Sequence, residues 1–287
     1  MTNDYGNLEL HQVLLAAMKD IDKICRENGL RYYLYAGTLL GAMNHKGFIP
    51  WDDDIDLAMF PDEFKRFAQI INEQYSDWYY VCIAGENAEW YTPANKFFIR
   101  GTKLIHEKGS LNMPLFIDFC LLHSVPDGKI QRFFQRKQLE LISLVWSIQA
   151  GHVVPNSLKA KLSIGLLAKI KGDFWNKYFT KVATKYDKSH TQYVGTMFDV
   201  LTPNPYNGKN GYDKDITPRY WHEEPVNVPF EDCMFMTLSD PVTDLNDRYP
   251  NWQKPYPKEK RASKHGVNSY YISEDLRKRI SMKGDES

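Results

Sequence analysis

Residues 31–59 read RYYLYAGTLLGAMNHKGFIPWDDDIDLAM, an aromatic run that leads through glycine-containing turns into four aspartates. The aromatic residues 31–36 predict a strand, and Gly37-Thr38 begins a glycine-punctuated connection that extends to Gly47. A second strand is predicted from Ile55 to Met59, so it starts inside the acidic run. The rest of the chain is interpreted around this acidic pair at the start of a strand.

Helix and strand patterns alternate on both sides of this segment. Apolar residues at three- and four-residue spacing from Leu10 predict a helix that ends at Gly29, and Pro61 is placed to start another helix. Further strands are predicted at 78–84, 95–100 and 115–122. The predicted fold class is α/β (α+β), a mixed sheet with flanking helices and a helical C-terminal region.

The second half of the chain has a different character. From residue 129 to 188 the pattern is helical, with apolar stretches at 139–148 and 162–170. Residues 201–257 are rich in proline, asparagine and tyrosine, which predicts loops and short strands around one helix at Asp240–Arg248, and the charged tail after Ser273 is expected to fray. We therefore predict a catalytic core over 1–128 and a helical and loop-rich region over 129–287 packed on it.

Composition narrows the class of protein. The 287 residues are 43% hydrophobic and 25% charged, as in an ordinary globular protein, and no apolar run is long enough to span a bilayer. The four cysteines are widely spaced and predict neither a zinc ribbon nor a disulfide framework. With no apolar segment at the N-terminus, the expected location is the cytoplasm.

Charge is unevenly distributed although the formal net charge is zero. Residues 129–188 hold twelve Lys and Arg residues against three acids, a net charge of about nine positive, and the remainder is equally negative. Such a segment suits a bound anion, either a phosphate-bearing glycan or an anionic membrane surface at the inner face of the membrane. A solvated helical surface is the alternative, and no nucleic-acid partner is predicted.

Three aspartates are the candidate catalytic and metal-binding residues. Alternation along a strand puts Asp54 and Asp56 on one side while Ile55 points into the core. Asp118 interrupts the apolar strand Phe116-Ile117-Asp118-Phe119-Cys120, where a lone charge is costly unless it is paired or binds metal. Carboxylate oxygens are the ligands that Mg²⁺ and Mn²⁺ prefer, so Asp54, Asp56 and Asp118 are predicted to hold one of these ions.

Four further residues are candidates for contact with phosphate. Gly37 and Thr38 would offer backbone amides and a hydroxyl, and Lys96 and Arg100, on or near the strand before Asp118, would neutralise phosphate charge. Ordinary surface charge is the alternative interpretation of the two cations.

Other chemistry is disfavoured. The sequence has no Gly-x-Ser-x-Gly motif, Walker loop or dinucleotide fingerprint. His123 and His265 have no identifiable partner and receive no role, and Asp52 and Asp53 are interpreted as turn residues or as support for the metal ligands.

The quoted segment resembles the LicD family, which includes bacterial phosphocholine transferases and, more distantly, the fukutin-related proteins. The resemblance is carried by residues 35–42 and 45–56, and Phe116-Ile117-Asp118-Phe119 is similar to the later acidic strand of the family. The chain departs from the family after Asp118, where a proline and another acid are usual but residues 120–127 read CLLHSVPD. The tyrosine-glycine pair expected near residue 249 is Tyr249-Pro250 here.

The resemblance implies a nucleotidyltransferase-like fold, a CDP-activated alcohol such as CDP-choline as donor, and CMP as leaving group. Asp54 and Asp56 would hold metal over the diphosphate, Asp118 would complete the site and activate the acceptor hydroxyl, and Lys96 or Arg100 would stabilise the phosphates. The implied acceptor is a cell-surface glycan or lipid-linked glycan, from lipopolysaccharide or a teichoic acid precursor, with residues 129–287 lining the acceptor side.

Two other functions stay open at this point. A nucleotidyltransferase that moves NMP from an NTP to a small molecule or protein would use the same acids. A catalytically silent module that binds a nucleotide or a glycan is the second alternative, and the presence of all three acids argues against it.

Overall fold

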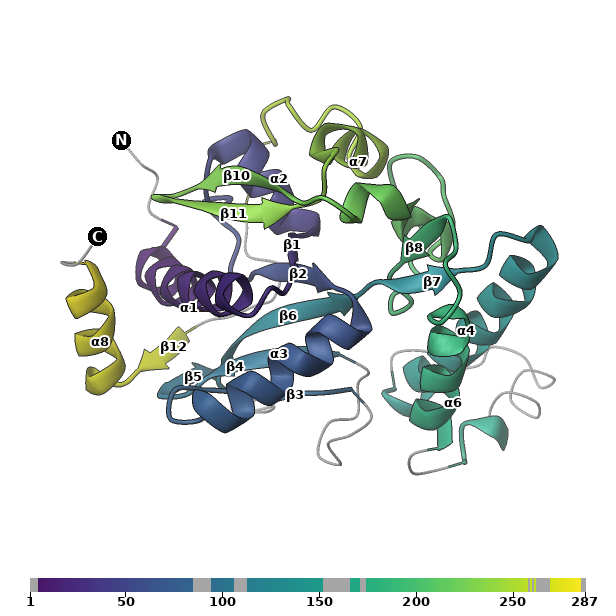
Figure 1. Cartoon of the computed structure of the whole chain (residues 1–287), viewed down its shortest axis with the longest axis horizontal. Helices are drawn as coiled ribbons and strands as arrows, with labels where there is room; N and C mark the ends of the chain where they lie inside the picture. Colours follow the sequence, from purple (N-terminus) through teal and green to yellow (C-terminus); the bar gives the residue numbers. More distant parts are fainter. Residues whose placement is uncertain are drawn as a thin grey trace.

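The computed structural model describes residues 5–84, 94–105, 113–151, 166–170, 174–257, 259, 261 and 269–284. Over these residues the chain forms a five-stranded sheet with flanking helices, and two- and three-stranded sheets accompany it (Figure 1). The α+β class predicted from the sequence is confirmed.

The helices and strands alternate through the first half of the chain. Their bounds in chain order are α1 Leu8–Glu27, β1 Tyr33–Leu34, α2 Ala36–His45, β2 Asp56–Met59, α3 Pro61–Gln74, β3 Tyr79–Cys82, β4 Asn95–Ile99, β5 Thr102–Ile105, β6 Leu115–Leu121, β7 His123–Val125, α4 Lys129–Gln149, α6 Phe174–Ala183, β8 Tyr193–Gly195, β9 Ile216–Pro218, β10 Val226–Phe230, β11 Cys233–Thr237, α7 Pro241–Arg248, β12 Ser269–Ile272 and α8 Glu274–Gly284.

The central sheet has the strand order β1-β2-β6-β4-β3. Strands β2 and β6 run parallel and the other neighbours run antiparallel, so the sheet is mixed, as predicted. The side chains of Leu57, Phe97 and Ile117 point to one face and join the core formed with α1 and α3. Because neighbouring residues on a strand face opposite ways, Asp56, Lys96 and Asp118 belong to the other face.

Helices α1 and α3 form where the apolar spacing predicts them. The residues of α1 at that spacing are buried, and Gly29 follows its end with φ +62°, a conformation that favours glycine. Helix α3 starts at Pro61 with two acids in its first turn, both favourable at a helix N-terminus. The ring of Phe64 lies 5.1 Å from that of Phe119, so α3 covers the buried face of the sheet.

Helix α2 replaces the predicted glycine-rich connection, and the strand predicted at 31–36 shortens to Tyr33–Leu34. Gly41, inside the helix, explains the difference. A Cβ atom at this position would lie 2.5 Å from the carbonyl oxygen of Gly47. The glycine therefore serves a close approach of two backbone segments rather than a turn.

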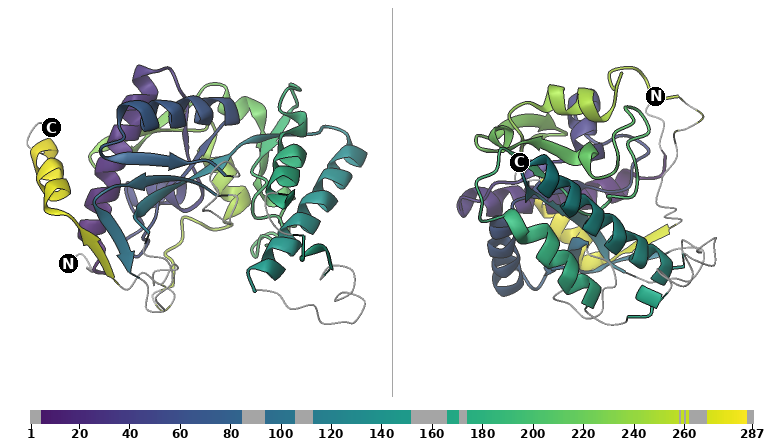
Figure 2. Two further views of the ribbon diagram at one scale, coloured as in Figure 1. Left: turned by 90° about the horizontal axis from the view of Figure 1, so that it is seen from below. Right: turned by 90° about the vertical axis from the view of Figure 1, so that its right-hand side faces the viewer.

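The segment after β6 builds a second cluster at one end of the molecule (Figure 2). Helices α4 and α6 pack together, with the rings of Trp146 and Phe179 5.1 Å apart, and β7, β8 and β9 form the adjoining three-stranded sheet. The helical pattern predicted over 139–148 is confirmed, while residues 162–165 of the predicted stretch 162–170 lie outside the described residues. No described helix is long and apolar enough to cross a bilayer.

The C-terminal segment returns to the first half of the chain. Strand β12 pairs antiparallel with β5, and the hairpin β10–β11 shares the core with α1. The expectation of a frayed tail after Ser273 is wrong, because α8 is anchored: Leu276 is buried and Arg279 bonds Asp20 at 2.9 Å while lying 4.4 Å from the Trp78 ring. The helix predicted at 240–248 is confirmed, with Asp240 as its N-cap, and the division at residue 128 stays a prediction.

Candidate functional site

Asp54 and Asp56 lie at the start of β2, on the face of the sheet away from α1 and α3. Ile55 between them is fully buried in the core, as the alternation predicts. The backbone N–H of Asp56 donates to the Thr38 hydroxyl at 2.8 Å, and its carbonyl accepts from the N–H of Tyr35 at 3.1 Å. The position of Asp56 is therefore fixed from the α2 side.

Asp118 is the partner of Asp56 in the parallel pairing of β2 and β6. Neighbouring strands lie about 4.8 Å apart, so the two acids are adjacent on one face. The N–H of Asp118 donates to the carbonyl of Ile55 at 3.0 Å, which continues the pairing to the residue between the two acids. Residues far apart in the sequence thus meet as predicted.

Lys96 supplies a positive charge at the same place. It is opposite Asp118 in the antiparallel pairing of β4 and β6, and its Nζ lies 2.5 Å from Asp118 Oδ1. The same ammonium lies 3.4 Å from the centre of the Phe116 ring, a cation–π contact. Three carboxylates and one ammonium therefore lie on the side of the sheet away from α1 and α3.

A cleft of about 950 Å³ covers these four residues. Its walls are β2, β4 and β6, the start of α3, helix α6 and residues 196–199, so both halves of the chain contribute. Cys120 also lines the cleft, and burial, followed by the nearby charges of Asp56 and Asp118, raises the pKa of its thiol well above the usual range. The thiol is therefore not a nucleophile here.

The donor atoms of the cleft fit a hard divalent cation. Asp54, Asp56 and Asp118 present only carboxylate oxygens, the ligand type of Mg²⁺ and Mn²⁺. Oxygen atoms of Asp52, Asp53 and Asp54 also lie within 4.8 Å of one another. Asp52 and Asp53 do not line the cleft, and the Asp52 carbonyl is bonded by Nδ2 of Asn7 and contacts Nε2 of His11 at 2.7 Å, so a supporting role in the turn stays the prediction for both acids.

Gly37 and Thr38 lie in the first turn of α2 and do not line the cleft. The Thr38 hydroxyl is used to hold Asp56, and a Cβ atom on Gly37 would lie 3.2 Å from the Asp52 carboxylate. Their visible role is to shape the acidic segment. Direct contact of either residue with phosphate stays a prediction.

Arg100 is not brought to the cleft. It follows β4 at the end opposite the Lys96 side, is exposed, and stacks its guanidinium 4.7 Å from the Tyr80 ring. Four residues of strand span about 13 Å, so equal facing along β4 does not bring Arg100 close to Asp118. Of the two predicted cations, the structure unites only Lys96 with the acids.

His123 is a cleft residue that the sequence interpretation left without a role. Its Nδ1 lies 2.8 Å from Oδ2 of Asp187, and the other oxygen of Asp187 accepts the backbone N–H of Ser124 at 2.8 Å. In the sequence, His123 is a polar residue directly after an apolar strand. Its partner Asp187 is far along the chain, so the pair could not be predicted. Only the fold could reveal the pair.

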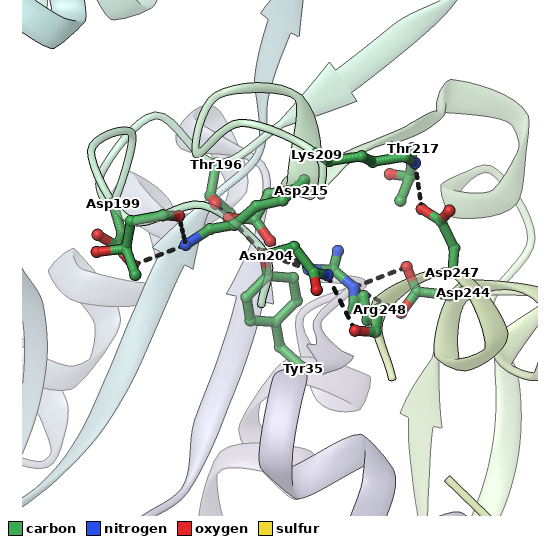
Figure 3. A network of polar contacts seen from close by, with 12 residues as sticks. Tyr35, Thr196, Asp199, Asn204, Lys209, Asp215, Thr217, Asp244, Asp247 and Arg248 are labelled. Carbon is green, nitrogen blue, oxygen red and sulfur yellow. Dashed lines mark hydrogen bonds and ion pairs between the residues drawn. The ribbon is translucent and has the colours of Figure 1, made fainter. Parts of the chain in front are cut away.

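A buried charge network centres on Arg248 (Figure 3). Arg248 donates from Nε to both oxygens of Asp244 at 2.9 Å, pairs with Asp215, and donates to the Tyr35 hydroxyl at 3.1 Å. That hydroxyl lies 3.3 Å from Oγ1 of Thr196, which lines the cleft. Arg248 thereby connects α7, the residues before β9 and the start of α2.

Comparisons with known proteins agree with the resemblance found in the sequence. Residues 29–120 match the family model described as LicD/FKTN/FKRP, nucleotidyltransferase domain. The lipopolysaccharide cholinephosphotransferase LicD of Haemophilus influenzae is 26% identical over 276 residues, which cover 92% of this chain and 99% of that protein. The human ribitol 5-phosphate transferase FKRP is 43% identical over 42 residues, 15% of this chain and 8% of FKRP. The resemblance to the LicD family is confirmed.

Proposed function

We propose that this chain, which carries a LicD family domain, is a transferase of phosphorus-containing groups that moves phosphocholine or a similar phospho-alcohol from a CDP-activated donor to a glycan hydroxyl. The observation that carries the proposal is the cleft in which Asp54, Asp56, Asp118 and Lys96 meet. The full-length similarity to a lipopolysaccharide cholinephosphotransferase supports the choice of reaction and a glycan acceptor.

In the proposed reaction, the acceptor oxygen forms a bond to the phosphorus next to the alcohol, and the bond from that phosphorus to CMP breaks. Asp118 takes the hydroxyl proton, and Lys96 stabilises the negative charge on the phosphates. Asp54, Asp56 and Asp118 would hold Mg²⁺ or Mn²⁺, which when bound neutralises phosphate charge. CMP leaves and the phospho-alcohol stays on the glycan.

The test is CMP release from CDP-choline with Mg²⁺ or Mn²⁺ and phosphocholine-free lipopolysaccharide as acceptor. Asp54→Asn and Asp118→Asn are expected to lower turnover at least a hundredfold, because each removes a charge that acts in the transition state. Asp77→Asn is the matched control, since Asp77 is an exposed aspartate outside the cleft. Equal turnover in all four proteins would refute the assigned site.

The donor alcohol and the alternative reaction are separated by the products. CDP-ribitol and CDP-glycerol are run beside CDP-choline, because FKRP is a ribitol 5-phosphate transferase. Diphosphate release from an NTP, without CMP release from any CDP-alcohol, would move the chain to the nucleotidyltransferase alternative. Nucleotide binding without any turnover would leave the silent binding module.

We also propose peripheral contact between α4 and an anionic membrane. The start of α4 exposes Ile130, Phe133 and Phe134 beside the exposed cations Lys129 and Lys137, a combination suited to the interface of an anionic leaflet. Flotation with phosphatidylglycerol vesicles is expected to carry the wild type, and the Phe133→Ser/Phe134→Ser variant less. No flotation of the wild type would overturn this proposal.

A further inference from the structure

The cleft extends beyond the acidic centre to a second polar region around His123. His123 lies five positions after Asp118, and at about 3.3 Å per residue the extended chain through β6 and β7 puts the two backbones roughly 16 Å apart (Figure 1). His123 is therefore not placed to exchange a proton at a phosphorus held by Asp54, Asp56 and Asp118. It lies where a different part of a bound molecule would be.

The pairing with Asp187 fixes which hydrogen-bonding group His123 presents. An ionised carboxylate only accepts hydrogen bonds, so Nδ1, 2.8 Å from Asp187, carries the proton. In the neutral ring Nε2 is then an acceptor. Asp187 is itself fixed by the N–H of Ser124, whose hydroxyl accepts from Arg219 at 2.6 Å, so the orientation of the ring is enforced.

The opposite wall of this region also presents acceptors. Thr180 and Thr184 on and after α6 donate their hydroxyl protons to the carbonyls of Asn176 and Thr180, at 3.0 and 2.7 Å, so their lone pairs are what remains for a ligand. Asp199 adds a carboxylate, of which Oδ2 accepts from Lys214 at 2.7 Å. Asn176 and Lys177 of α6 line the cleft too, so this wall combines acceptors with donors, which suits hydroxyl groups because each of them both donates and accepts.

The same region exposes an aromatic ring. Phe198 is 45% exposed and lines the cleft, so it offers an apolar surface next to the acceptors. A sugar ring combines hydroxyl donors at its rim with apolar C–H faces, which matches both features.

We propose that His123, oriented by Asp187, and Phe198 form a subsite for a sugar ring, in which His123 Nε2 accepts a hydrogen bond from a sugar hydroxyl. This inference rests on the proposed function for the identity of the sugar, which is either the acceptor glycan or the ribose of the nucleotide donor. His123 is a binding residue of this subsite and Asp187 is its positioning residue.

The experiment measures binding and turnover in parallel. Saturation-transfer NMR is recorded with CMP and with oligosaccharide released from phosphocholine-free lipopolysaccharide, and KM and kcat are measured for donor and acceptor. His123→Phe is expected to weaken one of the two ligands about tenfold, the value of one lost hydrogen bond, with kcat changed less than about threefold. His123→Gln, whose side-chain oxygen can replace Nε2 as acceptor, is expected to restore most of the affinity.

Two further variants separate binding from folding. Phe198→Ala alters an exposed ring on another element and is expected to weaken the same ligand as His123→Phe. His190→Phe is the matched control, because His190 is exposed and does not line the cleft. Weakened CMP binding assigns the subsite to the ribose, and weakened oligosaccharide binding assigns it to the acceptor.

The outcomes distinguish this inference from the proposed function. Turnover by the wild type with unchanged KM and binding in His123→Phe and Phe198→Ala overturns the subsite and leaves the function. Binding that depends on His123 without turnover by the wild type supports the subsite and refutes the function. Failure of both ligands to bind the wild type refutes the subsite.

Discussion

Replacing Arg248 by methionine should destabilise the protein far more than replacing an exposed arginine. The side chains of Arg248, Asp215 and Asp244 are 7%, 13% and 2% exposed, so the substitution leaves two buried carboxylates without their shared cation (Figure 3). It also removes the bond to the Tyr35 hydroxyl. Methionine keeps most of the aliphatic volume, so the loss reports charge and hydrogen bonding rather than a cavity.

The magnitude follows from burial. Breaking a buried ion pair by removing one partner costs about 3 to 5 kcal/mol. Burial already raises the pKa of Asp244, so this carboxyl takes up a proton readily once Arg248 is gone, which keeps the loss of stability at about 4 kcal/mol. With a urea m-value of about 3 kcal/mol/M, the unfolding midpoint should fall by roughly 1.3 M.

The assay is urea unfolding at pH 7 followed by circular dichroism. Arg277→Met is the matched control, because Arg277 pairs with Glu9 at 2.7 Å but the two side chains are 54% and 42% exposed. Such a pair contributes about 0 to 1 kcal/mol, so its midpoint should move by less than about 0.3 M. The Arg248→Met/Asp215→Asn/Asp244→Asn variant should recover at least half of the loss. Equal midpoints for the two single variants would refute the reasoning.

Three further predictions concern single residues. Lys96→Met removes the partner of Asp118, so it should lower the free energy of unfolding by about 1 to 2 kcal/mol. It should also increase the rise in Tm that Mn²⁺ produces, measured by differential scanning fluorimetry, because Asp118 is then shared with the metal alone. An unchanged Mn²⁺ response would contradict this sharing. Burial, followed by the charge of Arg248, lowers the pKa of His222 from 6.5 to about 3. Between pH 3 and 6.5 the unfolded protein binds a proton at this histidine and the folded protein does not, so the free energy of unfolding should fall by up to about 1.4 kcal/mol per pH unit as the pH drops from 6.5 towards 3. In urea unfolding, His222→Gln should show a shallower fall with pH, and parallel profiles for the variant and the wild type would contradict this prediction. Gly41→Ala should lose about 1 to 3 kcal/mol despite better helix propensity, because its Cβ would meet the Gly47 carbonyl; a stabilised variant by thermal unfolding would exclude that close approach.

Local periodicity was sufficient for the elements that carry the acids. The alternation around Ile55 predicted that Asp54 and Asp56 share a face, and the apolar strand around Asp118 predicted that this charge is paired or binds metal. Both inferences depend only on neighbours in the sequence, which is why they could be made. The prediction of a glycine-rich connection in place of α2 was wrong, because Gly41 permits the close approach of two backbone segments. No local sequence pattern contains such a contact.

Long-range pairs defined the limit of prediction for the site. Lys96 and Arg100 looked equivalent from their spacing, yet strand length places only Lys96 beside Asp118. His123 has its partner at Asp187, 64 residues later, and Arg248 has one of its partners at Asp215, 33 residues earlier. Motifs identify residues on one element, whereas pairs of this kind are known only once strands are in register.

The parallel pairing of β2 and β6 brings the acids of the cleft together. Register puts Asp56 beside Asp118, and Lys96 on β4 pairs with Asp118. Backbone hydrogen bonds hold β2 and β6 about 4.8 Å apart, so the two strands cannot separate to relieve repulsion between the carboxylates that they carry. A site of this kind costs stability unless a cation or a cationic complex offsets the repulsion. If the repulsion exceeds the pairing with Lys96, Asp118→Asn should unfold at a higher urea concentration than the wild type in chelator. A lower urea midpoint for Asp118→Asn in both chelator and Mn²⁺ would mean instead that the pair with Lys96 dominates.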